Sequence, residues 1–113
     1  MKLFHHTSVK AEEVSEPAVG VKVRWLITKK TGAPNFAMRL FEMEPGGSTP
    51  RHAHNWEHEA FILSGRGEVQ VEEGEKSFGP EDVVFVPSGE EHQFRNTGDE
   101  TVRFLCMIPL QDK

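Results

Sequence analysis

The sequence predicts an all-β domain of the sandwich or barrel class with little or no helix, and three observations support this. Short apolar runs recur at intervals of about ten residues, which is typical of such folds. Turn residues separate the runs, because the ten glycines and seven prolines lie mostly at breaks where ladder hydrogen bonds are not needed. The length of 113 residues is that of one domain, so we expect a single compact unit.

The first half of the chain supplies four expected strands. Apolar residues alternate with polar ones over residues 19–27, which is the two-residue period of a half-buried strand. After a turn at residues 31–35, a second strand is expected from Phe36 to Met43, closed by Pro45-Gly46-Gly47. The third and fourth strands are expected at residues 49–54 and 58–63.

The remaining elements are predicted from their turns. Further strands are expected between turns at residues 64–67, 73–74, 79–80, 87–89 and 97–99. Residues 1–17 lack clear periodicity, so this segment is an irregular lead-in, an edge strand or an arm that crosses to a partner. We place the barrel core at residues 34–110, within one domain that spans residues 1–113.

Composition restricts the function classes. Thirteen basic and eighteen acidic residues give a net charge of −5, and the absence of basic blocks argues against nucleic-acid binding. No apolar run approaches the roughly 18 residues of a membrane-spanning helix. The N-terminus lacks the pattern of a secretory signal, and Cys106 is the single cysteine, so we expect a cytoplasmic protein.

Four of the six histidines form a candidate metal site. His52 and His54 are two residues apart in an expected strand, so both imidazoles project from one face with Cα atoms about 6–7 Å apart. In a straight strand His58 would lie roughly 20 Å from His52, too far to share an ion, so the chain must fold back near Asn55-Trp56-Glu57. His92 would arrive from a later strand. Burial alone poorly explains such a cluster, because each buried imidazole needs partners for two ring nitrogens.

These residues carry a family resemblance. Gly46-x5-His52-x-His54, followed by Gly65, resembles the first cupin motif, and Pro87-x-Gly89-x2-His92-x3-Asn96 resembles the second. The chain departs from the family pattern in two places. His58 and Glu59 share the positions where the first motif usually has a glutamate, and the spacing to Gly65 favours His58 as the ligand. The leading glycine of the second motif is replaced by Glu81.

The wider sequence resembles the small single-domain manganese cupins with four histidine ligands. The string from Pro34 to Phe41, Trp56-Glu57-His58-Glu59 and the string from Phe104 to Pro109 contribute to this resemblance. It implies a cupin-type double-stranded β-helix (a jelly-roll barrel), a homodimer, and one divalent metal ion per chain, most simply manganese. Iron, nickel, zinc or copper could occupy the same nitrogen ligands.

Other residues are weaker candidates. Glu57 and Glu59 are either outer carboxylates that orient a ligand imidazole, Glu59 being also an alternative ligand, or plain solvated groups. Arg39 either orients an anionic substrate or points outward. The remaining candidates for the pocket lining, for which core packing is an equal explanation, are Phe94, Phe104, Cys106 and Ile108.

We therefore expect a metal-binding cupin that is an oxidoreductase, dioxygenase-like or peroxide-using, and acts on a small organic molecule. The alternative is a non-enzymatic module that binds or senses a small ligand at a metal-containing pocket. Its partners would be that small molecule and a second copy of the chain, with no nucleic acid and no membrane.

Overall fold

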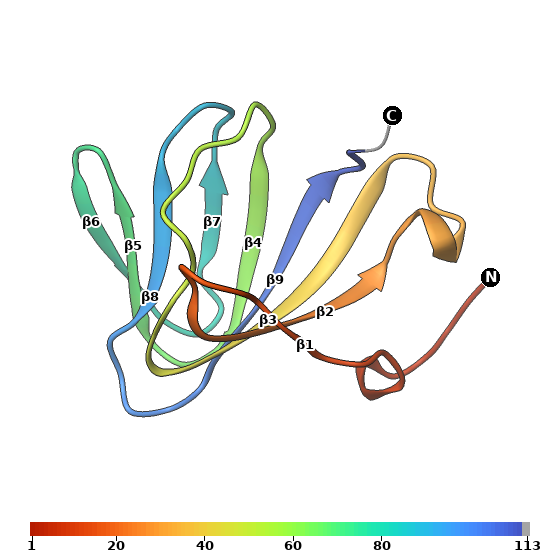
Figure 1. Ribbon diagram of the computed structural model, residues 1–113, viewed down its shortest axis with the longest axis horizontal. Coiled ribbons are helices and arrows are strands. Elements are labelled where there is room, and N and C mark those ends of the chain that lie inside the picture. Colours follow the sequence, from red (N-terminus) through yellow and green to blue (C-terminus); the bar gives the residue numbers. More distant parts are fainter. Residues whose placement is uncertain (112–113) are drawn as a thin grey trace.

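The computed structural model describes residues 1–111, and these form one curled β-sheet with no α-helix. Hydrogen-bonded neighbours in this sheet follow the order β6-β5-β8-β3-β9-β4-β7. Outside this order, β2 pairs with β3, and β1 pairs with β2. Figure 1 shows the sheet curling into an open half-barrel, with the N-terminus on the side where β2 lies. The strands are β1 Glu12–Glu13, β2 Val19–Ile27, β3 Phe36–Ser48, β4 His58–Ser64, β5 Gly67–Val71, β6 Gly74–Phe78, β7 Val83–Val86, β8 His92–Asn96 and β9 Val102–Pro109. Two short 3-10 turns, η1 His6–Ser8 and η2 Lys29–Thr31, complete the elements.

The all-β prediction is confirmed, but two expected strands differ. β3 does not close at Pro45-Gly46-Gly47 and runs on to Ser48, because Gly47 lets the chain pass another strand closely. A Cβ atom at Gly47 would lie 2.7 Å from the Val19 carbonyl oxygen. The expected strand at residues 49–54 is wrong: this stretch is irregular apart from one bridge between His52 and His92. Pro50 interrupts it, since proline has no N–H for a ladder.

The core lies on the concave face of the sheet. Strand alternation turns one side chain in two inward, and in β9 this places Val102, Phe104, Cys106 and Ile108 inside. The register pairs Phe41 with Phe104 and Arg39 with Cys106 across β3 and β9. The inward face of β3 therefore carries a cation next to the apolar core.

The N-terminal segment adds an edge strand and does not form a detached arm. β1 pairs with β2 through Glu12 opposite Val23, and the Val14 N–H donates to the Val21 carbonyl at 3.0 Å. The guanidinium of Arg24 donates to the Val9 carbonyl at 2.5 Å, which anchors the preceding residues. Within residues 1–111, no helix has the length and apolar character that crossing a membrane requires.

Candidate metal centre

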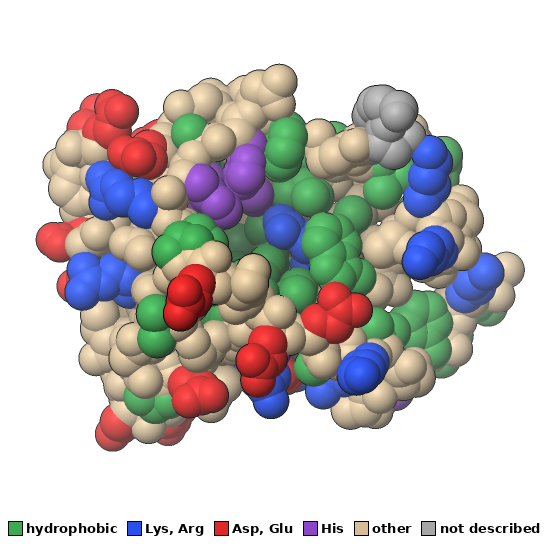
Figure 2. Space-filling model, in the orientation of Figure 1, with side chains coloured by type: hydrophobic (Ala, Val, Ile, Leu, Met, Phe, Trp, Pro, Cys, Tyr) green, Lys and Arg blue, Asp and Glu red, His purple; other side chains and the backbone are tan. Residues whose placement is uncertain are grey.

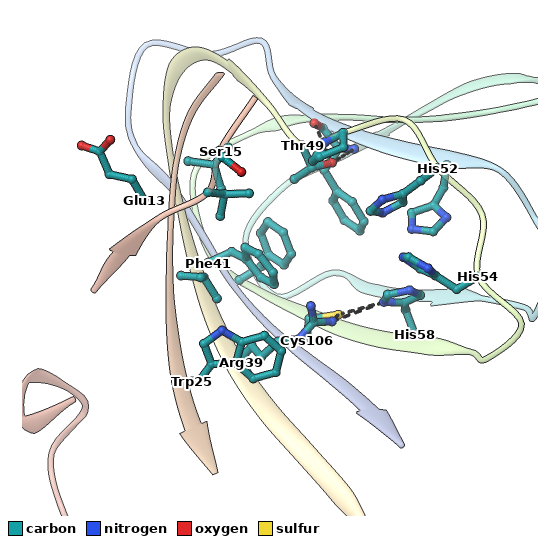
Figure 3. A pocket seen from close by; sticks show the side chains of 17 residues that line it. Glu13, Ser15, Trp25, Arg39, Phe41, Thr49, His52, His54, His58 and Cys106 are labelled. Atoms are coloured by element: carbon teal, nitrogen blue, oxygen red, sulfur yellow. Dashed lines mark hydrogen bonds between the residues drawn. The ribbon is translucent and has the colours of Figure 1, made fainter. Parts of the chain in front are cut away.

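Four histidines from separate parts of the chain gather at one end of the half-barrel. Figure 2 shows imidazoles at the edge of a hollow with an apolar floor, and Figure 3 shows His52, His54 and His58 on one side of it. The ring centroids of His52 and His54 are 4.2 Å apart, and those of His58 and His92 are 4.9 Å apart. Three further pairs have separations of 5.0 Å for His52 and His92, 5.1 Å for His54 and His58, and 6.0 Å for His54 and His92.

Backbone pairing holds these rings together although 34 sequence positions separate His58 from His92. His58 opens β4 and His92 opens β8. His52 and His92 exchange backbone hydrogen bonds of 3.1 and 3.0 Å, which join the irregular stretch to β8. The Gly89 N–H donates to the His54 carbonyl at 2.6 Å, so the turn before β8 is tied to His54. The chain reverses between His54 and His58, as the spacing of the histidines predicts.

The neighbours of Nδ1 in His92 and His58 help to determine which ring nitrogen is free to bind a metal. Nδ1 of His92 lies 2.9 Å from the Glu90 carbonyl oxygen, which can only accept, so Nδ1 carries a proton and Nε2 is the nitrogen that has the lone pair in the neutral ring. Nδ1 of His58 lies 3.4 Å from Cys106 Sγ and 3.4 Å from a terminal nitrogen of Arg39. Nε2 of His58 is buried and has no hydrogen-bond partner. An unpartnered buried nitrogen is costly unless something binds it.

The environment keeps the imidazoles of His52, His54 and His58 neutral. Burial, followed by the neighbouring His54 and His92, lowers the pKa of His52 to about 4. Burial, followed by His92 and Arg39, lowers the pKa of His58 to about 3. The pKa of His54 is also lowered, mainly by burial. Neutral imidazoles at physiological pH have free lone pairs, which is the form that binds metals.

As they stand, no three or more His, Cys, Asp or Glu side chains within residues 1–111 are arranged so that they could hold a metal ion. The structure therefore shows an imidazole cluster, and metal binding would require the donor nitrogens to converge further. The ring spacing suits such convergence. Metal–nitrogen bonds of about 2.0–2.2 Å put imidazole centroids about 4.5 Å apart for perpendicular bonds and about 6.4 Å apart for opposite bonds. Together with the unpartnered Nε2 of His58, this donor set fits a divalent cation.

A cavity of about 350 Å³ opens beside the four imidazoles. Arg39 projects into it from β3, and one of its terminal nitrogens donates to Cys106 Sγ at 3.1 Å. Figure 3 shows Arg39, Cys106 and His58 close together on one wall. Burial lowers the pKa of Arg39 and raises the pKa of the Cys106 thiol. Of the two orientations considered for Arg39, the structure shows the inward one.

The other candidate residues are distributed as follows. Phe94, Phe104 and Cys106 line the cavity. Ile108 is buried in the core but does not line it. Glu57 and Glu59 are exposed, and Glu59 lines a different cavity beside Met107. The β4 register puts Glu59 on the face opposite to His58, whose Nδ1 faces Cys106 and Arg39 instead of a carboxylate.

The sequence interpretation did not identify one wall of the cavity. Val21, Val23 and Trp25 line it from β2, and Val14 and Ser15 line it from the segment after β1. The alternation in residues 19–27 indicates a buried face, but it does not indicate what that face covers. Pairing of β2 with β3, which sets Trp25 opposite Arg39 and Val23 opposite Phe41, brings these side chains to the site.

Comparisons with known proteins agree with this architecture. Residues 39–108 match the family model described as Cupin domain. The crystal structure of the polyketide cyclase RemF from Streptomyces resistomycificus is similar, with a TM-score of 0.92 and 40% identity. That match covers 98% of this chain and 80% of the RemF chain. The cupin-type jelly-roll fold is thereby confirmed.

Two curated relatives match shorter stretches. The 1-methylthio-D-xylulose 5-phosphate methylsulfurylase of Rhodospirillum rubrum is 39% identical over 71 residues, which are 63% of this chain and 46% of that protein. The 5-nitrosalicylic acid 1,2-dioxygenase of a Bradyrhizobium species is 36% identical over 58 residues, which are 51% of this chain and 28% of that protein. The chain thus spans less than half the length of each of these two relatives.

Proposed function

The chain belongs to the cupin domain family, and from this premise we propose that it binds one divalent metal ion and acts on a small organic molecule in the adjoining cavity. The ligands would be His52, His54, His58 and His92. The observation that carries the proposal is the cluster of four imidazoles at the edge of the cavity, in which five of the six ring pairs have centroid separations of 4.2 to 6.0 Å. Manganese is the proposed ion, on the resemblance to four-histidine manganese cupins.

The protein's own groups would prepare the site in three ways. The Glu90 carbonyl fixes the His92 ring so that Nε2 faces away from it. The Cys106 sulfur is positioned to accept a hydrogen bond from His58 in the tautomer that carries its proton on Nδ1, and this tautomer leaves Nε2 free for a metal. Much of the cavity lining is apolar, and an apolar environment strengthens electrostatic interactions.

The proposed reaction class is oxidoreductase chemistry of the dioxygenase type, with molecular oxygen or peroxide as co-reactant. A bound manganese or iron ion would supply Lewis-acid and redox chemistry, whereas zinc supplies Lewis-acid chemistry alone. Similarity to a nitrosalicylate dioxygenase supports this class. Similarity to a polyketide cyclase across 98% of the chain favours a second candidate, a redox-neutral ring closure promoted by the same cation.

Metal analysis of tag-free protein tests the proposal. We expect about one divalent ion per chain by mass spectrometry, and loss of that ion in His52→Ala and His92→Ala. The matched control is the double variant His5→Ala, His6→Ala, which removes two imidazoles far from the cavity and should keep the ion. Equal metal content in all these proteins, or none in the wild type after incubation with manganese, zinc and iron, would refute the proposal.

Oxygen consumption and product analysis separate the reaction classes. Metal-loaded protein is incubated with enols, phenols and polyketide-type ketones. Oxygen uptake with an oxygenated product supports the dioxygenase class, and a product isomeric with its substrate or dehydrated, without oxygen uptake, supports ring closure. Ligand-dependent thermal shifts with no product from any member of the panel would favour the non-enzymatic binding alternative.

The proposed assembly is a homodimer. The outer face of β4 and β7 exposes Phe61 opposite Val83, and Phe85, opposite Glu59, lies two pairs further along on the same face. Val83 and Phe85 are 76% and 59% exposed, and contiguous apolar side chains of this kind mark contact surfaces. Sedimentation of the wild type should give the mass of two chains, and Phe85→Glu should shift it toward one. A wild type that sediments as a monomer at micromolar concentration contradicts the assembly.

A further inference from the structure

The cavity beside the imidazoles contains a cation without an anionic partner. The Nε of Arg39 is buried and unpartnered, and its terminal nitrogen contacts only a thiol and an imidazole, at 3.1 and 3.4 Å. Among residues 1–111, no carboxylate forms an ion pair with Arg39. A charge withdrawn from water without a counterion is unfavourable, so the guanidinium is available for an anion that enters the cavity.

Aromatic side chains form the wall next to this cation. The guanidinium carbon lies 4.9 Å from the ring centre of Phe41 and 5.4 Å from that of Trp25. Phe41 stacks on Phe104 at 5.1 Å, and Phe104 stacks on Phe94 at 4.7 Å. Phe94 in turn contacts the ring of His92 edge to face, at 6.4 Å. A continuous aromatic surface therefore leads from Arg39 to the histidine cluster.

We propose that the cavity selects planar aromatic or conjugated monoanions, whose charged oxygen pairs with Arg39 while the ring lies along the wall between Arg39 and His92. This inference rests on the proposed function, because it names the substrate class of the same site. Planar π-systems stack on aromatic side chains, and a guanidinium binds a carboxylate through two parallel hydrogen bonds.

The same wall disfavours sugar phosphates. Each hydroxyl of a sugar needs a polar partner when it is buried, and the wall offers few that are free. The Thr49 hydroxyl already accepts a hydrogen bond from the Phe94 N–H at 2.9 Å. Glu13 adds a negative charge to the cavity lining, which opposes a dianionic phosphate. The cavity of about 350 Å³ is also near the small end of ligand sites.

The test compares four probes on the whole chain by calorimetry and by tryptophan fluorescence, since Trp25 lines the cavity. The probes are 1-naphthoate, the uncharged 1-naphthalenemethanol, the non-aromatic cyclohexanecarboxylate and glucose 6-phosphate. We expect 1-naphthoate to bind at least about tenfold tighter than each of the others. Equal affinity for 1-naphthoate and 1-naphthalenemethanol, or tighter binding of glucose 6-phosphate, would overturn the inference. This comparison needs no variant.

Variants then assign the charge recognition. Arg39→Met should weaken 1-naphthoate binding about tenfold or more and change 1-naphthalenemethanol binding less than about threefold. The control Arg95→Met removes an exposed cation of β8 outside the cavity and should leave both affinities unchanged. If folded Arg39→Met binds 1-naphthoate as the wild type does, the inference is wrong.

Each titration is run with metal-free and with manganese-loaded protein, which separates the two proposals. Binding of 1-naphthoate that depends on Arg39 in a chain that takes up no metal supports this inference and refutes the proposed function. One metal ion per chain, combined with a 1-naphthoate affinity that is the same in Arg39→Met and in the wild type, supports the proposed function and refutes this inference.

Discussion

Asn96, the last residue of the second cupin motif, should prove to be a structural residue whose loss destabilises the fold. Its side chain is 4% exposed. Its amide nitrogen donates to the Met43 carbonyl at 2.9 Å and to the Glu100 carbonyl at 2.8 Å. Its amide oxygen accepts from the Gly98 N–H at 2.9 Å. One side chain thus links the end of β8, strand β3 and the turn before β9.

The magnitude follows from these three hydrogen bonds. A hydrogen bond contributes about 1 kcal/mol net, and a buried carbonyl left without a partner costs about 1–3 kcal/mol. Asn96→Ala should therefore lower the free energy of unfolding by about 3 kcal/mol or more, and the Tm by about 10 °C or more. Asn96→Asp should be no better, because a carboxylate cannot donate to the two carbonyls.

Urea denaturation followed by circular dichroism measures this effect on metal-free protein. The matched control is Asn55→Ala, which removes the same side chain at an exposed position in the turn before β4 and should change stability by less than about 0.5 kcal/mol. If Asn96→Ala and Asn55→Ala unfold at the same urea concentration, the reasoning from the hydrogen bonds of Asn96 is refuted.

Three further predictions concern pH and packing. The pKa of His58 is lowered to about 3 and that of His52 to about 4, below the unfolded value of 6.5, so the unfolded chain binds more protons between these limits. Metal-free protein should lose stability as pH falls from 6.5 toward 3, and a urea midpoint that stays constant between pH 7 and pH 5 would contradict this. Gly65→Ala should destabilise the protein far more than Gly46→Ala. Both glycines have positive φ, but of the two only Gly65 would place a Cβ against backbone, 2.7 Å from the Cα atom of Val102. Similar thermal midpoints for the two variants would disprove this prediction. Phe104→Ala, at a position 2% exposed, should cost about 3–5 kcal/mol, and a loss under about 1 kcal/mol in urea titration would show that the aromatic wall does not support the core.

The strands that alternation predicts well are those with one face buried. Residues 19–27 form β2 as expected, and the predicted strand from His58 extends by one residue to Ser64. In residues 19–27 the two-residue period directly reports the pleat of a half-buried strand. Residues 60–63 are instead a continuous apolar run, and the polar residues before it and the turn after it predict the strand. Local sequence was therefore sufficient for the elements that carry the core.

The stretch from Thr49 to His54 shows where alternation misleads. It has the spacing of a strand, yet only His52 bridges to a neighbour. The two imidazoles nevertheless lie together, with ring centroids 4.2 Å apart, because backbone hydrogen bonds to His92 and Gly89 hold the segment. The prediction that the histidines meet was correct, although the expected strand geometry was not the cause.

The orientation of Arg39 could not be predicted from periodicity. Its neighbours Met38 and Leu40 are apolar, so neither face of β3 is marked as polar. Pairing with Cys106 of β9 and with Trp25 of β2 fixes the inward direction. These pairings are tertiary contacts, and the proposed recognition role of Arg39 rests on aromatic side chains that include Trp25 of β2.

The wall formed by Val14 and Ser15 comes from a different part of the chain than the histidine cluster. It is attached through a two-residue strand and a few backbone contacts, while the four imidazoles of the cluster come from residues 52–92. Changes in residues 13–15 can therefore reshape one side of the cavity without altering the four proposed metal ligands. Under the proposed function, this short segment alone would adapt the cavity to different small molecules.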